Sequence, residues 1–176
     1  VWVIPFYFLG SANLRMLMRI SRHPTLIKSY KKNLCCCDEQ VTIGNPSNSN
    51  FFTYSFINSR FPSKGIFIKK NTKIGNNFTA ISLNEIKIGE NCLIGSNVKL
   101  LDSDFHSVSK DRKNGHISSK KIEIKDNVFI GDNVLILKGV IIGNNCTIGA
   151  GSVVTKSFPD NTILAGNPAR AIGFVQ

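Results

Sequence analysis

The chain has 176 residues, enough for one domain with a sizeable core, and a net charge of +11 from 22 Lys and Arg against 11 Asp and Glu. This charge calls for an anionic partner or surface, but the basic residues are scattered and form no nucleic-acid-binding signature, so we expect no nucleic-acid partner. The five Cys form no disulfide framework and favour a reducing, cytoplasmic setting, and the longest apolar stretch, Val1 to Leu9, is about half of a membrane span.

Residues 1–33 lack the sequence repeat of the later chain. Leu14, Leu17 and Met18 recur at helical spacing with arginines between them, which predicts a short basic amphipathic helix. We interpret 1–40 as an N-terminal helical or irregular cap over the open end of the domain. The alternative is peripheral contact with the inner face of the membrane. The role of the triplet Cys35 to Cys37 stays open.

A six-residue period dominates the later chain. The run from Ile124 to Ser152 reads IKDNVF IGDNVL ILKGVI IGNNCT IGAGS. Nine Ile obey one rule, with a slip of two residues between Ile74 and Ile88, and each is followed three residues later by Asn or Gly: Ile68, Ile74, Ile88, Ile94, Ile124, Ile130, Ile136, Ile142 and Ile148. In the later run a small residue comes four places after each Ile: Val128, Val134, Val140, Cys146 and Ser152.

Neither a strand nor a helix returns to the same place every six residues, but a coil with three flat sides does. Ile would fill its interior, and Asn or Gly would turn its corners with positive φ. Stacked coils of about eighteen residues bury one continuous column. The sequence therefore predicts an all-β fold, a parallel β-helix over 41–172, with 173–176 as a tail. A β-sandwich would instead require irregularly spaced turns.

The repeat is interrupted once at length. Residues 102–121, DSDFHSVSKDRKNGHISSKK, are polar and charged and lack the Ile, which predicts an extruded loop. Insertions at the corners of a solenoid commonly carry the functional site. His suits general-base catalysis because its pKa lies near working pH, and His106 lies at the root of the loop whereas His116 lies near its tip. Asp102, Asp104 and His106 alternate, so in an extended chain they would share one face, and either carboxylate could orient the imidazole.

These features resemble a known family. The hexads occur in order with DSDFH (102–106), RKNG (112–115), GAGSVVTK (149–156) and AGNPAR (165–170), a combination that resembles the hexapeptide-repeat acyltransferases. The similarity covers about 66–172 and is strongest to the maltose, galactoside and polysaccharide O-acetyltransferase branch. It implies a left-handed β-helix, acetyl-CoA as donor, and a homotrimer whose active sites lie between subunits.

The resemblance also implies roles for individual residues. His106 matches the catalytic His, and Asp104 is the preferred carboxylate partner. The positions that match the donor groove are Asp132, Ala150, Thr155, Lys156 and, near the adenine, Arg170. We assign Asn84, Asp102 and Arg112 to the acceptor side. No metal is expected.

The predicted function is direct transfer of acetyl from acetyl-CoA to a sugar hydroxyl, in O-antigen or capsule biosynthesis. A free small sugar or another small acceptor is the nearest alternative. A non-catalytic trimeric scaffold that binds glycan is a second. A zinc enzyme of the carbonic anhydrase type would require His23 to join His106 and His116.

Overall fold

The computed structural model describes residues 25–29, 35–38, 40–43 and 55–176. The predicted amphipathic helix at residues 14–20 lies outside these ranges. In the described part every regular element is a strand, and no helix there is long and apolar enough to cross a membrane.

The strands form three sheets, parallel except for the last pair. The six-stranded sheet consists of β1 (Thr25–Ser29), β4 (Ser55–Ser59), β7 (Thr79–Ser82), β10 (Lys99–Leu101), β13 (Leu135–Leu137) and β16 (Val153–Val154). The five-stranded sheet consists of β2 (Cys35–Cys37), β5 (Gly65–Ile68), β8 (Glu85–Ile88), β11 (Ile122–Ile124) and β14 (Ile141–Ile142). The seven-stranded sheet consists of β3 (Thr42–Ile43), β6 (Lys73–Ile74), β9 (Leu93–Ile94), β12 (Phe129–Ile130), β15 (Thr147–Ile148), β17 (Thr162–Gly166) and β18 (Ala169–Phe174).

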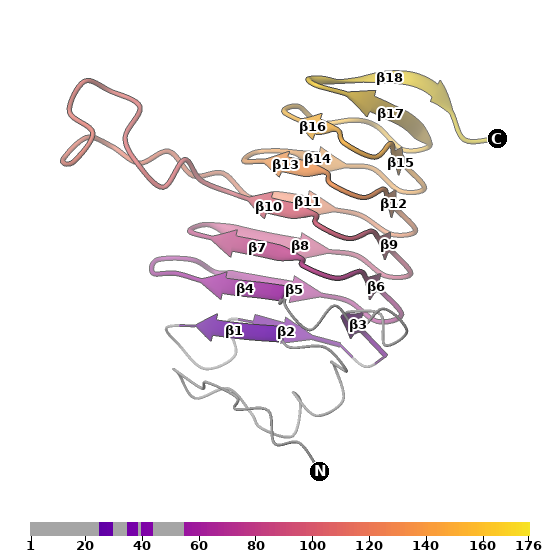
Figure 1. The fold of residues 1–176 in the computed structure, drawn as a ribbon, viewed down its shortest axis with the longest axis horizontal. Helices are drawn as coiled ribbons and strands as arrows, with labels where there is room; N and C mark the ends of the chain where they lie inside the picture. Colours follow the sequence, from indigo (N-terminus) through magenta and orange to yellow (C-terminus); the bar gives the residue numbers. More distant parts are fainter. Residues whose placement is uncertain (1–24, 30–34, 39, 44–54) are drawn as a thin grey trace, which may run out of the picture.

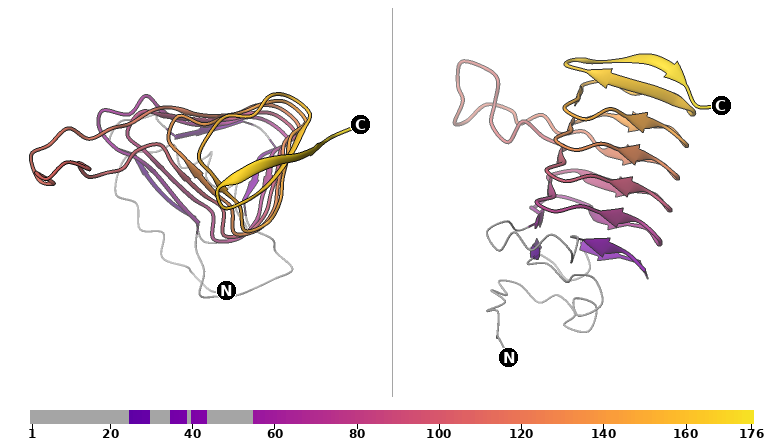
Figure 2. Two further views of the ribbon diagram at one scale, coloured as in Figure 1. Left: turned by 90° about the horizontal axis from the view of Figure 1, so that it is seen from above. Right: turned by 45° about the vertical axis from the view of Figure 1, so that its right-hand side comes forward.

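From β1 to β15 the chain visits the three sheets in turn, one strand from each per coil. Seen along the stack, the coils superpose as a triangle (Figure 2), and from the side they rise one above another (Figure 1). Residues 102–121 leave this stack between β10 and β11 and project well beyond it. The predicted parallel β-helix and its extruded loop are therefore confirmed.

The hexad rule describes the interior and the corners. All nine Ile are between 0 and 4% exposed, and the small residues four places later are also buried. All nine Asn or Gly have φ between +56° and +80°. Asn and Gly tolerate this left-handed region best, so they turn the nine corners at which they stand. Each buried Ile contributes about 1.5–3 kcal/mol.

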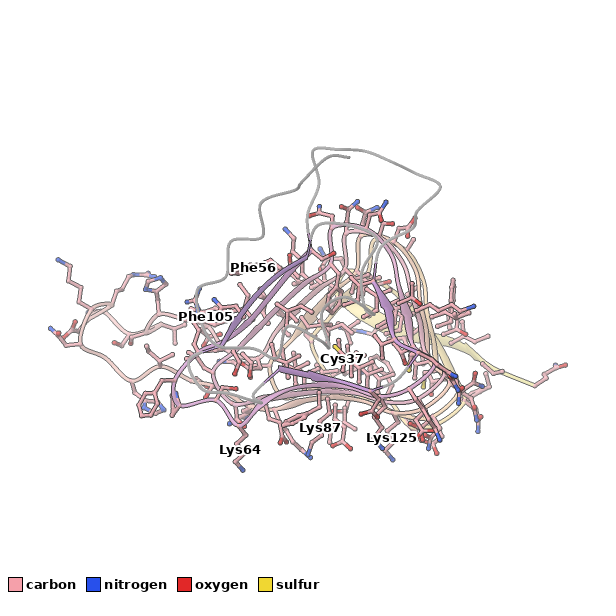
Figure 3. All side chains as sticks on the ribbon, turned by 90° about the horizontal axis from the view of Figure 1, so that it is seen from below. Cys37, Phe56, Lys64, Lys87, Phe105 and Lys125 are labelled. Atoms are coloured by element: carbon pink, nitrogen blue, oxygen red, sulfur yellow. The ribbon has the colours of Figure 1, made fainter. Side chains whose placement is uncertain are left out.

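The stack extends beyond the predicted borders at both ends. β1 and β2 lie within 1–40, yet β1 pairs with β4 and β2 pairs with β5, with Cys37 beside Ile68. Cys37 is buried inside the triangle (Figure 3), so it continues the inward column of that sheet. At the other end β18 includes the start of the predicted tail, because it folds back antiparallel to β17 as far as Phe174.

Candidate active site

Two corners of the triangle hold all the predicted site residues except Arg170, which lies on β18. The loop corner joins the six-stranded to the five-stranded sheet and contains residues 83–84, 102–121, 138–140 and 155–157 in successive coils. The Asp132 corner joins the seven-stranded to the six-stranded sheet and contains residues 95–98, 131–134 and 149–152. The six-stranded sheet lies between the two corners.

The root of the loop is a short two-stranded clamp. Ser103 and Ser119 form an antiparallel bridge, the N–H of Asp104 donates to the carbonyl of Ser118 at 3.2 Å, and that of Lys120 donates to the carbonyl of Asp102 at 2.9 Å. The N–H of Gly139, in the coil above, donates to the carbonyl of Lys120 at 3.2 Å. The two ends of the loop are therefore fixed to each other and to the stack.

Asp102 is fully buried and binds the corner below the loop. Its Oδ1 accepts from the N–H of Leu83 at 2.7 Å, and its Oδ2 accepts from the Ser82 hydroxyl at 2.7 Å and from the N–H of Asn84 at 2.8 Å. This corner carries the two extra residues that lengthen the spacing between Ile74 and Ile88. Extra backbone donors need an acceptor when they are buried, and the Asp102 carboxylate supplies it.

We therefore expect Asp102 to contribute to the stability of the fold. Asp102→Ala removes the acceptor of two backbone N–H groups and one hydroxyl, which should lower the free energy of unfolding by about 2–4 kcal/mol. Chemical denaturation measures this loss. Asp111→Ala is the control, since among the described residues the exposed Asp111 carboxylate accepts only from Lys113 and Asn114 of its own turn. Equal stability of Asp102→Ala and the unmodified protein would contradict this role.

Asp104 is paired with a cation instead of with the imidazole. Its Oδ2 accepts from the Lys138 ammonium, and both side chains are about a quarter exposed, at 28 and 26%. Neither Asp102 nor Asp104 forms a hydrogen bond with His106 in the described part of the chain. The alternation argument placed all three side chains on one face, but the extended run it assumed ends at Phe105, where φ is +59°.

His106 follows that turn and is exposed. His116 is exposed as well, and so is Arg112, which lies in the outer part of the loop. The turn there is held by Asp111, whose carboxyl pKa is lowered chiefly by the N–H of Asn114. His106 thus combines access to solvent with a place directly after Phe105, whose N–H donates to the Ser103 hydroxyl of the root. His116 lies on the other arm of the loop, two residues before Ser118.

Asn84 lies in the corner that Asp102 holds. Its N–H donates to Asp102, and its carbonyl accepts from the N–H of Lys64 at 2.6 Å. Its side-chain amide forms no hydrogen bond with the described residues and is part-exposed. The backbone of Asn84 is therefore fixed while the amide stays available to a ligand.

Asp132 takes part in a repeated contact between coils. Its Oδ1 accepts from the N–H of Ser96 in the coil below at 2.7 Å. Asp126 does the same for Glu90 at 2.8 Å, and Asp160 for Asn144 at 2.9 Å. The side-chain amide and the N–H of Asn144 lower the pKa of Asp160. Asp132 thus has a structural role, and its contact with a donor stays a prediction.

The other predicted donor residues are exposed, and all but Arg170 divide between the two corners. Ala150 follows Asp132 one coil higher in the Asp132 corner, and Thr155 and Lys156 lie in the loop corner above His106. The Lys156 ammonium lies 5.6 Å from the centroid of the Phe158 ring. Arg170 lies on β18 opposite Ala165 and donates to the carbonyl of Ala169 at 3.0 Å. One chain therefore does not bring all of these residues together.

Sequence reasoning missed two residues of the loop corner. Lys138, which pairs with Asp104, could have been recognised from the sequence. It is a Lys at the hexad position where other hexads have Asp126, Asp132 or Asn144. Arg60 lies against Phe105, and no pattern in the sequence connects residues so far apart. Within the described residues no three His, Cys, Asp or Glu side chains could hold a metal ion together.

Comparison with known proteins identifies the class of protein to which the chain belongs. A family model described as bacterial transferase hexapeptide (six repeats) matches residues 121–156, and one described as hexapeptide repeat of succinyl-transferase matches residues 85–99. A crystal structure of a hexapeptide-repeat containing acetyltransferase from Vibrio cholerae superposes with a TM-score of 0.57 at 32% identity, covering 67% of this chain and 70% of that one. The fold is the left-handed parallel β-helix of the hexapeptide-repeat proteins.

Two relatives from Escherichia coli K12 indicate the branch of the family to which the chain belongs. WbbJ, provisionally named a lipopolysaccharide biosynthesis O-acetyl transferase, is 31% identical over 170 residues, 88% of this chain and 86% of WbbJ. Galactoside O-acetyltransferase is 43% identical over 107 residues, 61% of this chain and 53% of that protein. The chain spans about half the length of the galactoside O-acetyltransferases that it matches. The protein belongs to the hexapeptide-repeat acyltransferase family, in the branch of the galactoside, maltose and polysaccharide O-acetyltransferases.

Proposed function

We propose that the protein transfers acetyl from acetyl-CoA to a carbohydrate hydroxyl, with His106 as the general base. The position of His106 is the main support: it is exposed and directly follows Phe105, which is bound to the root of the one long insertion in the described stack. The family and the printed names of the two Escherichia coli relatives support the acetyl group and the oxygen acceptor.

The chemistry requires one base and no covalent enzyme intermediate. His106 takes the proton of the acceptor hydroxyl as its oxygen attacks the thioester carbon. The tetrahedral intermediate then expels the thiolate of coenzyme A, which receives the proton from the imidazolium. The Asn84 amide is the candidate donor to the oxyanion, because it lies in the same corner and has no hydrogen-bond partner among the described residues.

We also propose that the active unit is a homotrimer. The predicted donor residues Asp132 and Ala150 lie across the six-stranded sheet from the loop corner of their own chain. A neighbouring subunit that presents its Asp132 corner to His106 would complete the site. Sedimentation equilibrium should give three times the mass of the chain, and a monomeric, fully active protein would rule this arrangement out.

Lys156 and Arg170 are the proposed contacts to the donor phosphates. Each change to Ala should raise KM for acetyl-CoA about tenfold, because each removes one charge-assisted contact to phosphate. The loss should shrink with a donor that lacks the 3′-phosphate, for whichever residue binds that group. Lys125→Ala removes an exposed Lys at a different corner, near the face of the five-stranded sheet (Figure 3), and should leave KM unchanged. A parallel rise in KM for the acceptor would indicate a folding defect instead.

A surface polysaccharide or its lipid-linked precursor is the proposed acceptor. WbbJ supports this choice, because it aligns with most of this chain and its provisional name refers to lipopolysaccharide biosynthesis. A free small sugar is the second candidate, supported by galactoside O-acetyltransferase. Release of coenzyme A with a panel of lipid-linked glycans and free sugars separates the two. A glycan-binding scaffold would release none with any acceptor.

The cytoplasmic location and contact with the inner face of the membrane also stay proposals. The residues that suggested membrane contact lie outside the described ranges. Cell fractionation tests both, and recovery of the protein outside the cell would contradict them.

A further inference from the structure

The residue before His106 has an unusual backbone. Phe105 has φ +59°, and apart from Gln40 every other described non-glycine residue with positive φ is an Asn. A bulky side chain rarely adopts this left-handed conformation, because its Cβ approaches the following carbonyl oxygen. Such a residue persists only when its surroundings hold it, and residues of this kind concentrate at functional sites.

Contacts of three residues hold the turn at Phe105. Its N–H donates to the Ser103 hydroxyl at 3.0 Å, and that hydroxyl donates to the carbonyl of Ser118 at 3.2 Å across the clamp. Asp104, which directly precedes Phe105, is paired with Lys138. Backbone and ion pair therefore fix the chain on the stack up to Phe105.

The third contact fixes the ring. The Arg60 guanidinium carbon lies 5.1 Å from the centroid of the Phe105 ring, within the range of a cation–π interaction. Arg60 follows β4 in the same loop corner, two coils below β10, and its N–H donates to the carbonyl of Ser82 at 2.8 Å. Figure 3 shows Phe105 on the side of the triangle from which the loop leaves. The stack itself thus holds the ring beside His106.

We propose that Phe105 and Arg60 are positioning residues for His106, which rests on the proposed role of His106 as the base. The left-handed turn directs His106 away from the buried Asp102 and the paired Asp104, and the Arg60 contact fixes the angle of that turn. An extended chain would carry His106 on the same face as the two carboxylates. The turn therefore frees the imidazole for the acceptor hydroxyl.

Steady-state kinetics of single and double variants test the proposal. Arg60→Ala and Phe105→Asn should each lower kcat about tenfold with KM for acetyl-CoA unchanged, because a misplaced base loses rate and not donor affinity. Asn tolerates positive φ, so the second variant removes the ring and keeps the turn accessible. The double variant should be no slower than the worse single variant, since both changes remove one contact. Phe105→Tyr keeps the aromatic ring and should have the same kcat as the unmodified protein.

Lys64→Ala is the matched control, because it removes another exposed charge from the same corner and should leave kcat unchanged. The proposal is overturned if Arg60→Ala keeps most of kcat, or if the losses in the two single variants multiply in the double variant. Because Arg60 is exposed, we expect Arg60→Ala to fold, so its kcat tests the proposal even if Phe105→Asn does not fold.

A readout without turnover separates this inference from the proposed function. The readout is the rate at which His106 is carbethoxylated, divided by the rate for His116 in the same sample. This ratio should change in Arg60→Ala and should equal that of the unmodified protein in Phe105→Tyr. An unchanged ratio overturns the positioning role whether or not the protein transfers acetyl. Full activity of His106→Ala would instead overturn the proposed base, whatever the behaviour of Arg60.

Discussion

Replacing His106 with Ala is expected to lower kcat for acetyl transfer by about 10² to 10⁴-fold, the usual contribution of a general base. KM for acetyl-CoA should stay within a few fold, because donor binding and proton transfer use different residues. Steady-state kinetics with each substrate varied in turn measure both effects. The exposure of His106 also predicts that its removal leaves the thermal unfolding temperature unchanged.

His116→Ala is the control for this result. It removes the same side chain from the other arm of the same loop, away from Phe105, and should keep most of the activity. If His116→Ala is the inactive variant, or if His106→Ala retains more than about a tenth of kcat, another group is the base. The membership of the family would not be affected.

Ile136→Asp is expected to prevent folding. Ile136 is fully buried in β13 and pairs in register with Leu100 below and Val154 above, so the carboxylate would have no charge partner and no water. Burying such a group costs several kcal/mol, on the order of the whole stability of a small domain. Soluble yield and circular dichroism measure the outcome.

Lys99→Asp is the matched control on the neighbouring strand β10. Lys99 is exposed and pairs in register with Leu135, so a carboxylate there stays in water, and folding should be normal. Soluble Ile136→Asp protein with an unchanged unfolding temperature would show that the interior column is assigned incorrectly.

The period of six made the stack predictable from sequence. Each Ile, and each Asn or Gly three places later, meets the same environment in every coil, so nine copies of one local rule determine the fold. Cys92 and Cys146 follow the rule as well, and burial raises the pKa of both thiols. Position within the hexad was enough, because contacts between coils repeat along the chain.

The loop corner was only partly predictable. The insertion and His106 could be recognised because they interrupt the rule, but the role of Asp102 depends on backbone donors in the coil below. The pairing of Asp104 with Lys138 likewise depends on the coil above. A left-handed Phe105 has no sequence signal, since Phe disfavours that conformation. A contact that occurs once, between residues far apart in the chain, produces no repeating sequence pattern from which it could be predicted.

Acetyl transfer itself is tested most directly with acetyl-CoA labelled in the acetyl group and a lipid-linked glycan as acceptor. The unmodified protein should place the label on the glycan, mild alkali should release it as expected for an ester of a hydroxyl, and His106→Ala should transfer almost none. An unlabelled glycan across the acceptor panel would contradict the proposed function. Label that resists alkali would contradict an oxygen acceptor, and equal labelling by His106→Ala would contradict the proposed base.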